Sequence, residues 1–501
     1  MELQRTQTDL GLEDFLLLAA ILLLPWAFGG VEIWAYRIAA FLLVSGAGVA
    51  RWKRGPAGWG LGDRQALWLL PAFLLALWAA MQLVPLPSGV VRALSPEADR
   101  IYTRSIPGYA GSSADPVAAL EAVALEQVPE AQSFASPEGF DPALEVDPPA
   151  CLERAWRSLS LQPSATQERL FWYVALLLGF LTVRQRVGDQ QVYRVYRGSL
   201  FAMAGLLALF ALVQDQTWNG KIYWFRRPRS NPEAFGPYVS PTHFVGVMEL
   251  CLPWLAGYAW ARVRRLGRDA FRDARFAAVV LAAVTCLVAS IAAASKAGAV
   301  LILASLALLG LIGARQWRTR LVVIVLGLAL AGGAFALRTE TRLGERVSEY
   351  VSRVEGGQLM EGRLAAWAAT TEIIRDYPLT GTGFGTYREA STRYAPAGSY
   401  KRFIRAHNDY IEVVSEGGLI AAGLIGWLMV GFGIRAARRL RRQNGALSVS
   451  RLGLALGLAT LALHAVVDFN HQIPANALLF VALAALLVTV PVISSDKRRG
   501  S

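Results

Sequence analysis

Four histidines supply the side chains best suited to acid–base chemistry. They are His243, His407, His464 and His471, and each lies near one end of an apolar block. Imidazole is the side chain whose ordinary pKa permits proton transfer near neutral pH. Histidine also suits membrane interfaces, so this placement is equally compatible with anchoring. The HExxH spacing and cysteine partners of zinc sites are missing, and we therefore predict neither a metal nor a cofactor.

The densest group of polar residues lies in FIRAHNDYIEVVSEGGLIAAGLIGW, residues 403–427. His407 stands where a loop meets an apolar block, and Asn408 suits a helix N-cap. Three carboxylates follow at i, i+3 and i+7, on one helical face: Asp409, Glu412 and Glu416. Carboxylates in a spanning helix are costly and usually line a polar cavity. Capping and interface roles are the alternative. We favour a catalytic role for His407 and substrate binding by Asn408, Glu412 and Glu416.

Basic residues gather in two runs beside apolar blocks. The run KIYWFRRPR contains Arg226, Arg227 and Arg229, and residues 388–405 contain Arg402 and Arg405. Arginine and lysine suit a phosphate or diphosphate. Anchoring to lipid headgroups explains many of these residues equally well.

Two cations stand apart from the runs. Lys296 lies in the short turn SKAG, and Arg363 begins the amphipathic stretch RLAAW. Their isolation favours a functional role in binding a lipid-linked diphosphate. The glycine pattern GTGFG at 381–385 lacks a phosphate-binding lysine after it, so we interpret it as a tight loop that shapes the cavity.

The elements that must position these residues are membrane-spanning helices. Of 501 residues, 54% are hydrophobic and 17% are charged, which is too apolar for a soluble protein. The three cysteines form no CxxC pair, so a structural disulfide is not expected. Twelve apolar blocks are long enough to span a bilayer: 14–30, 35–50, 66–84, 168–183, 196–214, 240–261, 276–294, 296–314, 321–337, 409–434, 452–468 and 475–493. The predicted fold is an all-α, polytopic membrane protein with about 12 transmembrane helices.

The basic residues also predict the orientation. With the N-terminus inside, the seven inner segments hold 27 lysines and arginines of the 50 in the chain. All four histidines then lie at the outer side. The predicted organisation is spans one to three in 1–84, a long outer loop in 85–167, spans four to nine in 168–337, an outer catalytic loop in 338–408, and spans ten to twelve with an inner tail in 409–501. Within the first loop, 111–150 reads as flexible cover.

The ordered motifs resemble those of the bacterial O-antigen ligase and polymerase superfamily. They are WRSLSLQPSAT (156–166), GPYVSPTHFVGVMELCLPWLAG (236–257), SKAG (295–298), GRLAAWAATTEIIRDYPLTGTGFGTY (362–387), AHNDYIEVVSEGGLIAAG (406–423) and HAVVDFNHQIPAN (464–476). The His-Asn and Glu-Gly signature at 406–423 is the most specific. Lys296 stands where the family usually has arginine, and Ser240, Pro241 and Thr242 stand where it has Asn-Arg-Asn.

The resemblance implies a glycosyltransferase of the C-type fold in the bacterial inner membrane, with its active site facing the periplasm. It implies an undecaprenyl-diphosphate-linked glycan as donor and no metal or nucleotide sugar. His407 would activate the acceptor, while Lys296 and Arg363 would bind the diphosphate. We also assign substrate binding to Arg226, Arg227, Arg229, His243, Arg402, Arg405, His464 and His471. Membrane lipids are expected partners, and nucleic acid is not.

Several functions share this signature. Ligation of O-antigen to a glycolipid, glycan polymerisation and protein O-glycosylation differ in their acceptor, which the motifs do not separate. A polysaccharide transporter is the alternative of another class, but transporters show paired halves with interrupted helices. A further alternative is a non-catalytic assembly protein that keeps the fold. The departures from the family pattern at Lys296 and at 240–242 are the features that would fit this alternative.

Overall fold

The computed structural model describes residues 10–55, 64–106, 109, 156–228, 234–314, 358–394, 403–441 and 446–489. The predicted span 321–337, the flexible cover 111–150, Arg229 and Arg402 lie outside these ranges.

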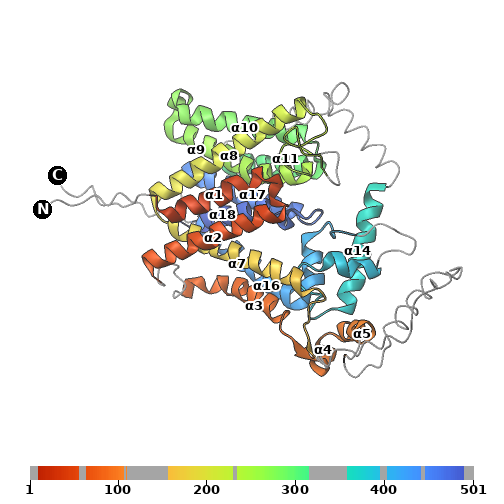
Figure 1. The fold of residues 1–501 in the computed structure, drawn as a ribbon. Coiled ribbons are helices and arrows are strands. Elements are labelled where there is room, and N and C mark those ends of the chain that lie inside the picture. The colour runs from red at the N-terminus through yellow and green to blue at the C-terminus, as the bar shows by residue number, and fades with distance from the viewer. Residues whose placement is uncertain are drawn as a thin grey trace.

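The described chain is almost entirely helical (Figure 1). The α-helices are α1 (Leu12–Leu23), α2 (Ile33–Arg54), α3 (Leu70–Met81), α4 (Ser88–Leu94), α5 (Pro96–Ser105), α7 (Pro163–Arg186), α8 (Gln190–Gln216), α9 (Pro241–Leu266), α10 (Ala274–Ala292), α11 (Lys296–Gly313), α14 (Gln358–Asp376), α15 (Tyr387–Ala390), α16 (Asp409–Arg441), α17 (Ala446–His464) and α18 (Pro474–Val488). Short 3₁₀ turns are η1 (Leu24–Trp26), η2 (Phe28–Gly30), η4 (Arg64–Leu69), η6 (Gly267–Arg272), η8 (Ser391–Tyr394) and η9 (Asn470–Gln472). Two strands, β1 (Leu86–Pro87) and β2 (Trp156–Arg157), pair antiparallel.

A helix is present at every predicted span that falls within the described ranges. Among the described residues, six helices are long and apolar enough to cross a membrane: Ile33–Arg54, Gln190–Gln216, Pro241–Arg272, Ala274–Ala292, Lys296–Gly313 and Asp409–Arg441. Three apolar helices in the same ranges are shorter: Leu67–Met81, Ser448–His464 and Pro474–Val488. The chain is thus a polytopic helical membrane protein, but within the described residues length and composition support six spans, and the predicted count of twelve is not shown.

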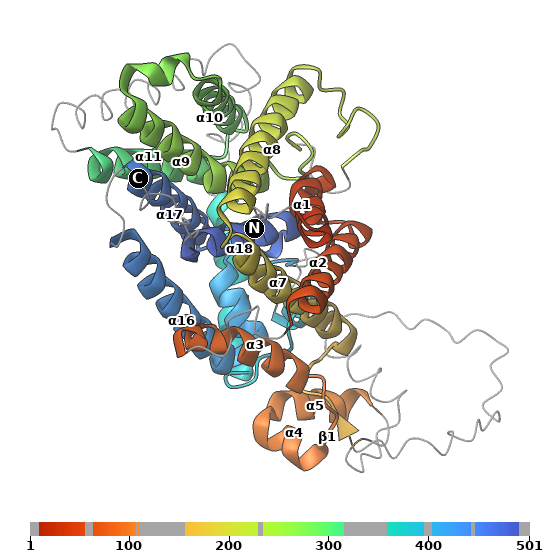
Figure 2. The same ribbon diagram turned by 90° about the vertical axis from the view of Figure 1, so that its left-hand side faces the viewer.

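Proline residues begin several helices because their missing N–H is not needed in the first turn. Pro241 begins α9 and Pro474 begins α18, next to the cavity described below. Helix α18 lies in the middle of the bundle when it is viewed end-on (Figure 2), and nearly all of its side chains are buried. The helices around it, among them α1, α7, α9 and α17, bury the apolar core against it.

One end of the bundle holds a buried network of charges. The Arg186 guanidinium at the end of α7 forms an ion pair with Asp14 in α1, and both side chains are almost fully buried. Glu13 accepts ion pairs from Lys53 at 2.9 Å and from Arg54 at 3.1 Å at the end of α2. The start of α1 therefore meets the basic ends of α2 and α7, as the predicted orientation requires.

The other end carries a helical cap built from the two predicted outer loops. Helices α4, α5 and α14 lie there together (Figure 1). Their apolar cluster includes Tyr102 of α5, Ile373 of α14 and Tyr387 of α15. Arg393 of η8 also forms an ion pair with Glu97 of α5. Segments that are nearly 300 residues apart therefore form one unit beside the site.

Candidate functional site

A cavity of about 1130 Å³ opens between the cap and the helical bundle. Three helices contribute residues near their starts: α7, α9 and α14. Turns and loops supply the rest of the wall: the α1–α2 turn, the loop before α9, the turn around Gly385, the loop before α16 and the α17–α18 turn. It brings together six residues predicted from the sequence: Arg226, Arg227, His243, Arg363, Arg405 and His407.

His407 enters this cavity from a loop with an unusual backbone. Its φ is +53°, a left-handed conformation that side chains other than glycine adopt at a cost. Glu412 of α16 holds the loop, since its carboxylate accepts hydrogen bonds from Arg405 Nη1 and from the Ala406 N–H, both at 2.8 Å. Burial opposes the charge on Arg405, but the Glu412 carboxylate outweighs it and raises the pKa of Arg405. Arg405 therefore stays charged and keeps the loop in place.

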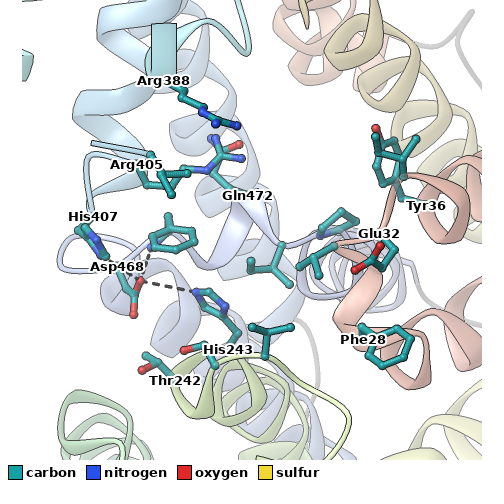
Figure 3. Close-up of a pocket in the computed structure, with 18 of the residues that line it drawn as sticks. Phe28, Glu32, Tyr36, Thr242, His243, Arg388, Arg405, His407, Asp468 and Gln472 are labelled. Carbon is teal, nitrogen blue, oxygen red and sulfur yellow. Dashed lines mark hydrogen bonds and ion pairs between the residues drawn. The ribbon is translucent and has the colours of Figure 1, made fainter. Parts of the chain in front are cut away.

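Asp468 lies between two histidines (Figure 3). Its Oδ1 is 3.9 Å from His407 Nδ1 and 3.8 Å from His243 Nε2. The Phe469 ring packs edge-on against both imidazoles. Burial opposes ionisation of Asp468, but the two histidines outweigh it and lower its pKa below the ordinary value. Asp468 is therefore an anion at neutral pH that lies beside both imidazoles.

The orientation of His407 follows from these contacts. Nδ1 is buried on the side of Asp468, without a hydrogen-bond partner among the described residues. The side chain as a whole is 42% exposed, so its other edge meets the cavity. That edge is the part of the ring available to a substrate hydroxyl.

Arginine dominates the charge of the cavity. Arg226 pairs with Glu32, and Arg405 pairs with Glu412. Four further arginines line the wall, and their guanidinium groups form no hydrogen bond or ion pair with another described residue: Arg169, Arg227, Arg363 and Arg388. Partnerless guanidinium groups in a shared cavity can bind a multiply charged anion such as a diphosphate.

A sharp turn and a helix kink shape the wall behind these arginines. Gly383 donates its N–H to Glu416 O at 2.9 Å, and Glu416 Oε1 accepts the Tyr387 N–H at 3.0 Å. Gly418 interrupts α16 with a φ of +68°, because its backbone packs against Leu379 O. The predicted interpretation of GTGFG as a tight loop fits this geometry, and Gly385 lines the cavity.

Three residues expected to bind substrate lie behind the wall rather than on it. Glu412 and Glu416 are buried and hold the loops described above. Asn408 caps α16, since its Oδ1 accepts the N–H groups of Tyr410 and Ile411 at 3.0 and 3.2 Å. The structure thus gives these residues supporting contacts, and substrate binding by them stays a prediction.

Three other predicted residues are not brought to the cavity wall. Lys296 is exposed at the first position of α11. His464 Nδ1 is 2.7 Å from Glu249 Oε1 in a fully buried pair, and His471 Nδ1 is 3.0 Å from Asp409 Oδ2. Their assigned roles also remain predictions.

Several cavity residues were missed from the sequence. Asp468 lies in HAVVDFNHQ, between two histidines that were noticed, and its position beside them is the signal that could have found it. Arg388 begins the basic run 388–405 noted in the sequence but was not assigned to substrate binding, and Arg169 gave no signal of its own. Across the described ranges, no group of three or more histidine, cysteine, aspartate or glutamate side chains has the arrangement of a metal site.

The comparisons with known proteins give one family match. No curated protein matches the chain. The family model described as O-antigen ligase matches residues 281–427, which include Lys296, Arg363, Arg405 and His407. This match supports the resemblance of the chain to the O-antigen ligase and polymerase superfamily.

Proposed function

We propose that this protein transfers a glycan from an undecaprenyl-diphosphate-linked donor to an acceptor hydroxyl on the periplasmic side of a bacterial inner membrane. One observation carries the proposal. His407, beside the anionic Asp468, shares a cavity with four arginines that have no partner among the described residues. The cavity therefore combines a group that can accept a proton with cations that can receive a diphosphate.

The proposed reaction is a single displacement. The acceptor oxygen forms a bond to the anomeric carbon, and the bond from that carbon to the diphosphate oxygen breaks. The hydroxyl proton passes to His407, and Asp468 stabilises the imidazolium that results. The departing lipid diphosphate takes the electron pair, and the arginines neutralise it. Attack opposite the leaving group inverts the configuration at the anomeric carbon, and this scheme needs no metal.

The acceptor separates three forms of this proposal: a glycolipid for a ligase, a growing glycan for a polymerase, and a protein for an O-oligosaccharyltransferase. The family match is compatible with all three forms. We further propose that α1, α3, α7, α17 and α18 cross the membrane together with the six longer helices.

The test is transfer by the full chain in liposomes that contain a lipid-diphosphate glycan donor. We expect His407→Ala to abolish transfer while expression and elution on gel filtration stay normal, because its ring edge is exposed to the cavity. His407→Gln adds information, since partial activity would favour positioning of the hydroxyl over proton transfer. Normal product from a stable His407→Ala protein would contradict the catalytic role.

A further inference from the structure

The cavity has two walls of different chemistry (Figure 3). Arg388, Arg405 and His407 lie on one side, with Asp468 beneath them. Glu32 and Tyr36 lie across the cavity, on the α1–α2 side. The first wall was assigned above to the diphosphate and to the acceptor hydroxyl, and the second has no assigned role.

Glu32, Tyr36 and Glu168 form the polar part of the second wall, here called the carboxylate wall. Glu32 is the N-cap residue of α2, but its side chain does not cap the helix. Tyr36 lies one turn further on the same face and donates its hydroxyl to Glu168 Oε1. Both carboxylates are partly exposed, at 27% and 34%.

Each carboxylate uses one oxygen and leaves the other available. Glu32 Oε1 forms an ion pair with Arg226. Glu168 Oε1 accepts a hydrogen bond from the Tyr36 hydroxyl and another, 3.0 Å long, from the Arg37 guanidinium. Oε2 of each glutamate has no partner among the described residues. The wall therefore offers two carboxylate oxygens that can accept hydrogen bonds from a ligand.

These oxygens exclude a phosphate and favour hydroxyl groups. A carboxylate repels a diphosphate, whereas it accepts strong hydrogen bonds from neutral O–H donors. Arg226 and Arg37 pair with the two glutamates, and Arg169, next to Glu168 on α7, also lines the cavity, so charges of both signs meet at this wall. Trp172 packs edge-on against Tyr36 and supplies an apolar surface beside the carboxylates.

We infer that the carboxylate wall is a sugar-binding subsite, in which Glu32, Tyr36 and Glu168 bind hydroxyl groups of an uncharged part of the glycan. This inference rests on the proposed function, since it requires that the cavity receives a lipid-linked glycan. A cavity of about 1130 Å³ exceeds the usual range for a small ligand, so it has room for sugar units beside the diphosphate. The sugar belongs either to the donor, next to its diphosphate, or to the acceptor.

The test measures binding and turnover by the full chain with Glu168→Gln and Glu32→Gln, two variants on different helices that preserve side-chain shape. The binding probes are undecaprenyl diphosphate carrying the glycan and undecaprenyl diphosphate without sugar. We expect KM for one glycan substrate to rise about tenfold or more in each variant, the effect of one lost charge-assisted hydrogen bond. Binding of the sugar-free lipid should stay at the wild-type level.

The kinetic parameters identify the sugar. A rise in donor KM with weaker binding of the glycan-bearing lipid assigns the subsite to the donor, and a rise confined to acceptor KM assigns it to the acceptor. Equal weakening for the sugar-free lipid would overturn the inference, as would unchanged values for both substrates. Normal binding of the sugar-free lipid also shows that a variant is folded.

Glu372→Gln is the matched control, because Glu372 is an exposed glutamate of α14 that pairs with Arg375 and does not line the cavity. It should behave as the wild type does. The two proposals fail separately: no transfer by the wild-type protein would contradict the proposed function, whereas transfer that the carboxylate variants leave unchanged would contradict only the sugar subsite.

Discussion

Arg363 and Lys296 carry the same charge but occupy different surroundings. Arg363 is half-buried in the cavity wall at the second turn of α14, whereas Lys296 is exposed at the start of α11 and does not line the wall. A diphosphate in the cavity would therefore contact Arg363 more directly. The isolation of both residues in the sequence made them look equivalent, because spacing along the chain says nothing about which helix ends meet.

We expect Arg363→Ala to lower transfer about ten- to hundred-fold, since one charge-assisted contact to the leaving group contributes about 1.5–3 kcal/mol. Lys296→Ala should lower it less, and Lys296→Arg should be tolerated. Transfer rates in the same liposomes, with protein amount checked by gel filtration, measure both effects. Wild-type rates for Arg363→Ala would move the donor site to other arginines of the cavity.

At the level of single residues, the sequence singled out several side chains that the structure places in one cavity, but it did not identify the residues that contact them. His407, Arg363 and Arg405 were found because they begin or precede recognisable elements. Asp468 and Glu32 were missed, because their roles depend on turns that meet only in three dimensions. The prediction for Glu412 and Glu416 had the right helical face, but that face packs behind the loop that carries His407.

At the level of elements, the kink in α16 positions the site. Gly418 has a φ of +68°, and a Cβ there would lie 2.0 Å from Leu379 O. The kink allows the 380–387 turn to pack against Glu416, which in turn holds the wall near Gly385. Hydrophobic periodicity predicted the helix but not its interruption, since an apolar run does not show where backbone from another segment approaches.

We expect Gly418→Ala to destabilise the protein by about 1–3 kcal/mol or more, because it adds both backbone strain and a clash. The apparent melting temperature in detergent should fall, and transfer should fall with it. Gly423→Ala is the matched control on the same helix, where a Cβ would meet nothing within 4 Å. Equal melting temperatures for both variants would show that the kink is not required.

For the whole molecule, the distribution of lysine and arginine predicted which helix ends lie together. The basic ends of α2 and α7 meet the start of α1, and the cap with the cavity lies at the opposite end. The number of spans was harder to predict, because α7 carries charges and α17 and α18 are short. Such helices are buried within the bundle and pack against other helices. An isolated span would instead need apolar residues wherever it faces lipid.

The orientation can be tested by cysteine labelling in a Cys151→Ser background, since Cys251 and Cys286 are buried. Arg104 of α5 and Arg268 of η6 are exposed at opposite ends of the predicted topology. A membrane-impermeant maleimide should label Arg104→Cys in intact spheroplasts and Arg268→Cys only after lysis. The reverse pattern would place the cavity on the cytoplasmic side.

The buried charge network at the start of α1 has a consequence for biogenesis. Glu13 can be neutralised as soon as α2 emerges from the ribosome, because Lys53 and Arg54 end that helix. Asp14 must wait for Arg186, 172 residues later. An unpaired carboxylate is costly within a membrane protein, so the ion pair with Arg186 contributes to stability only once α7 has been made and has packed against α1. The amino-terminal third of the chain is therefore expected to gain this contact as a unit, after both helices are present.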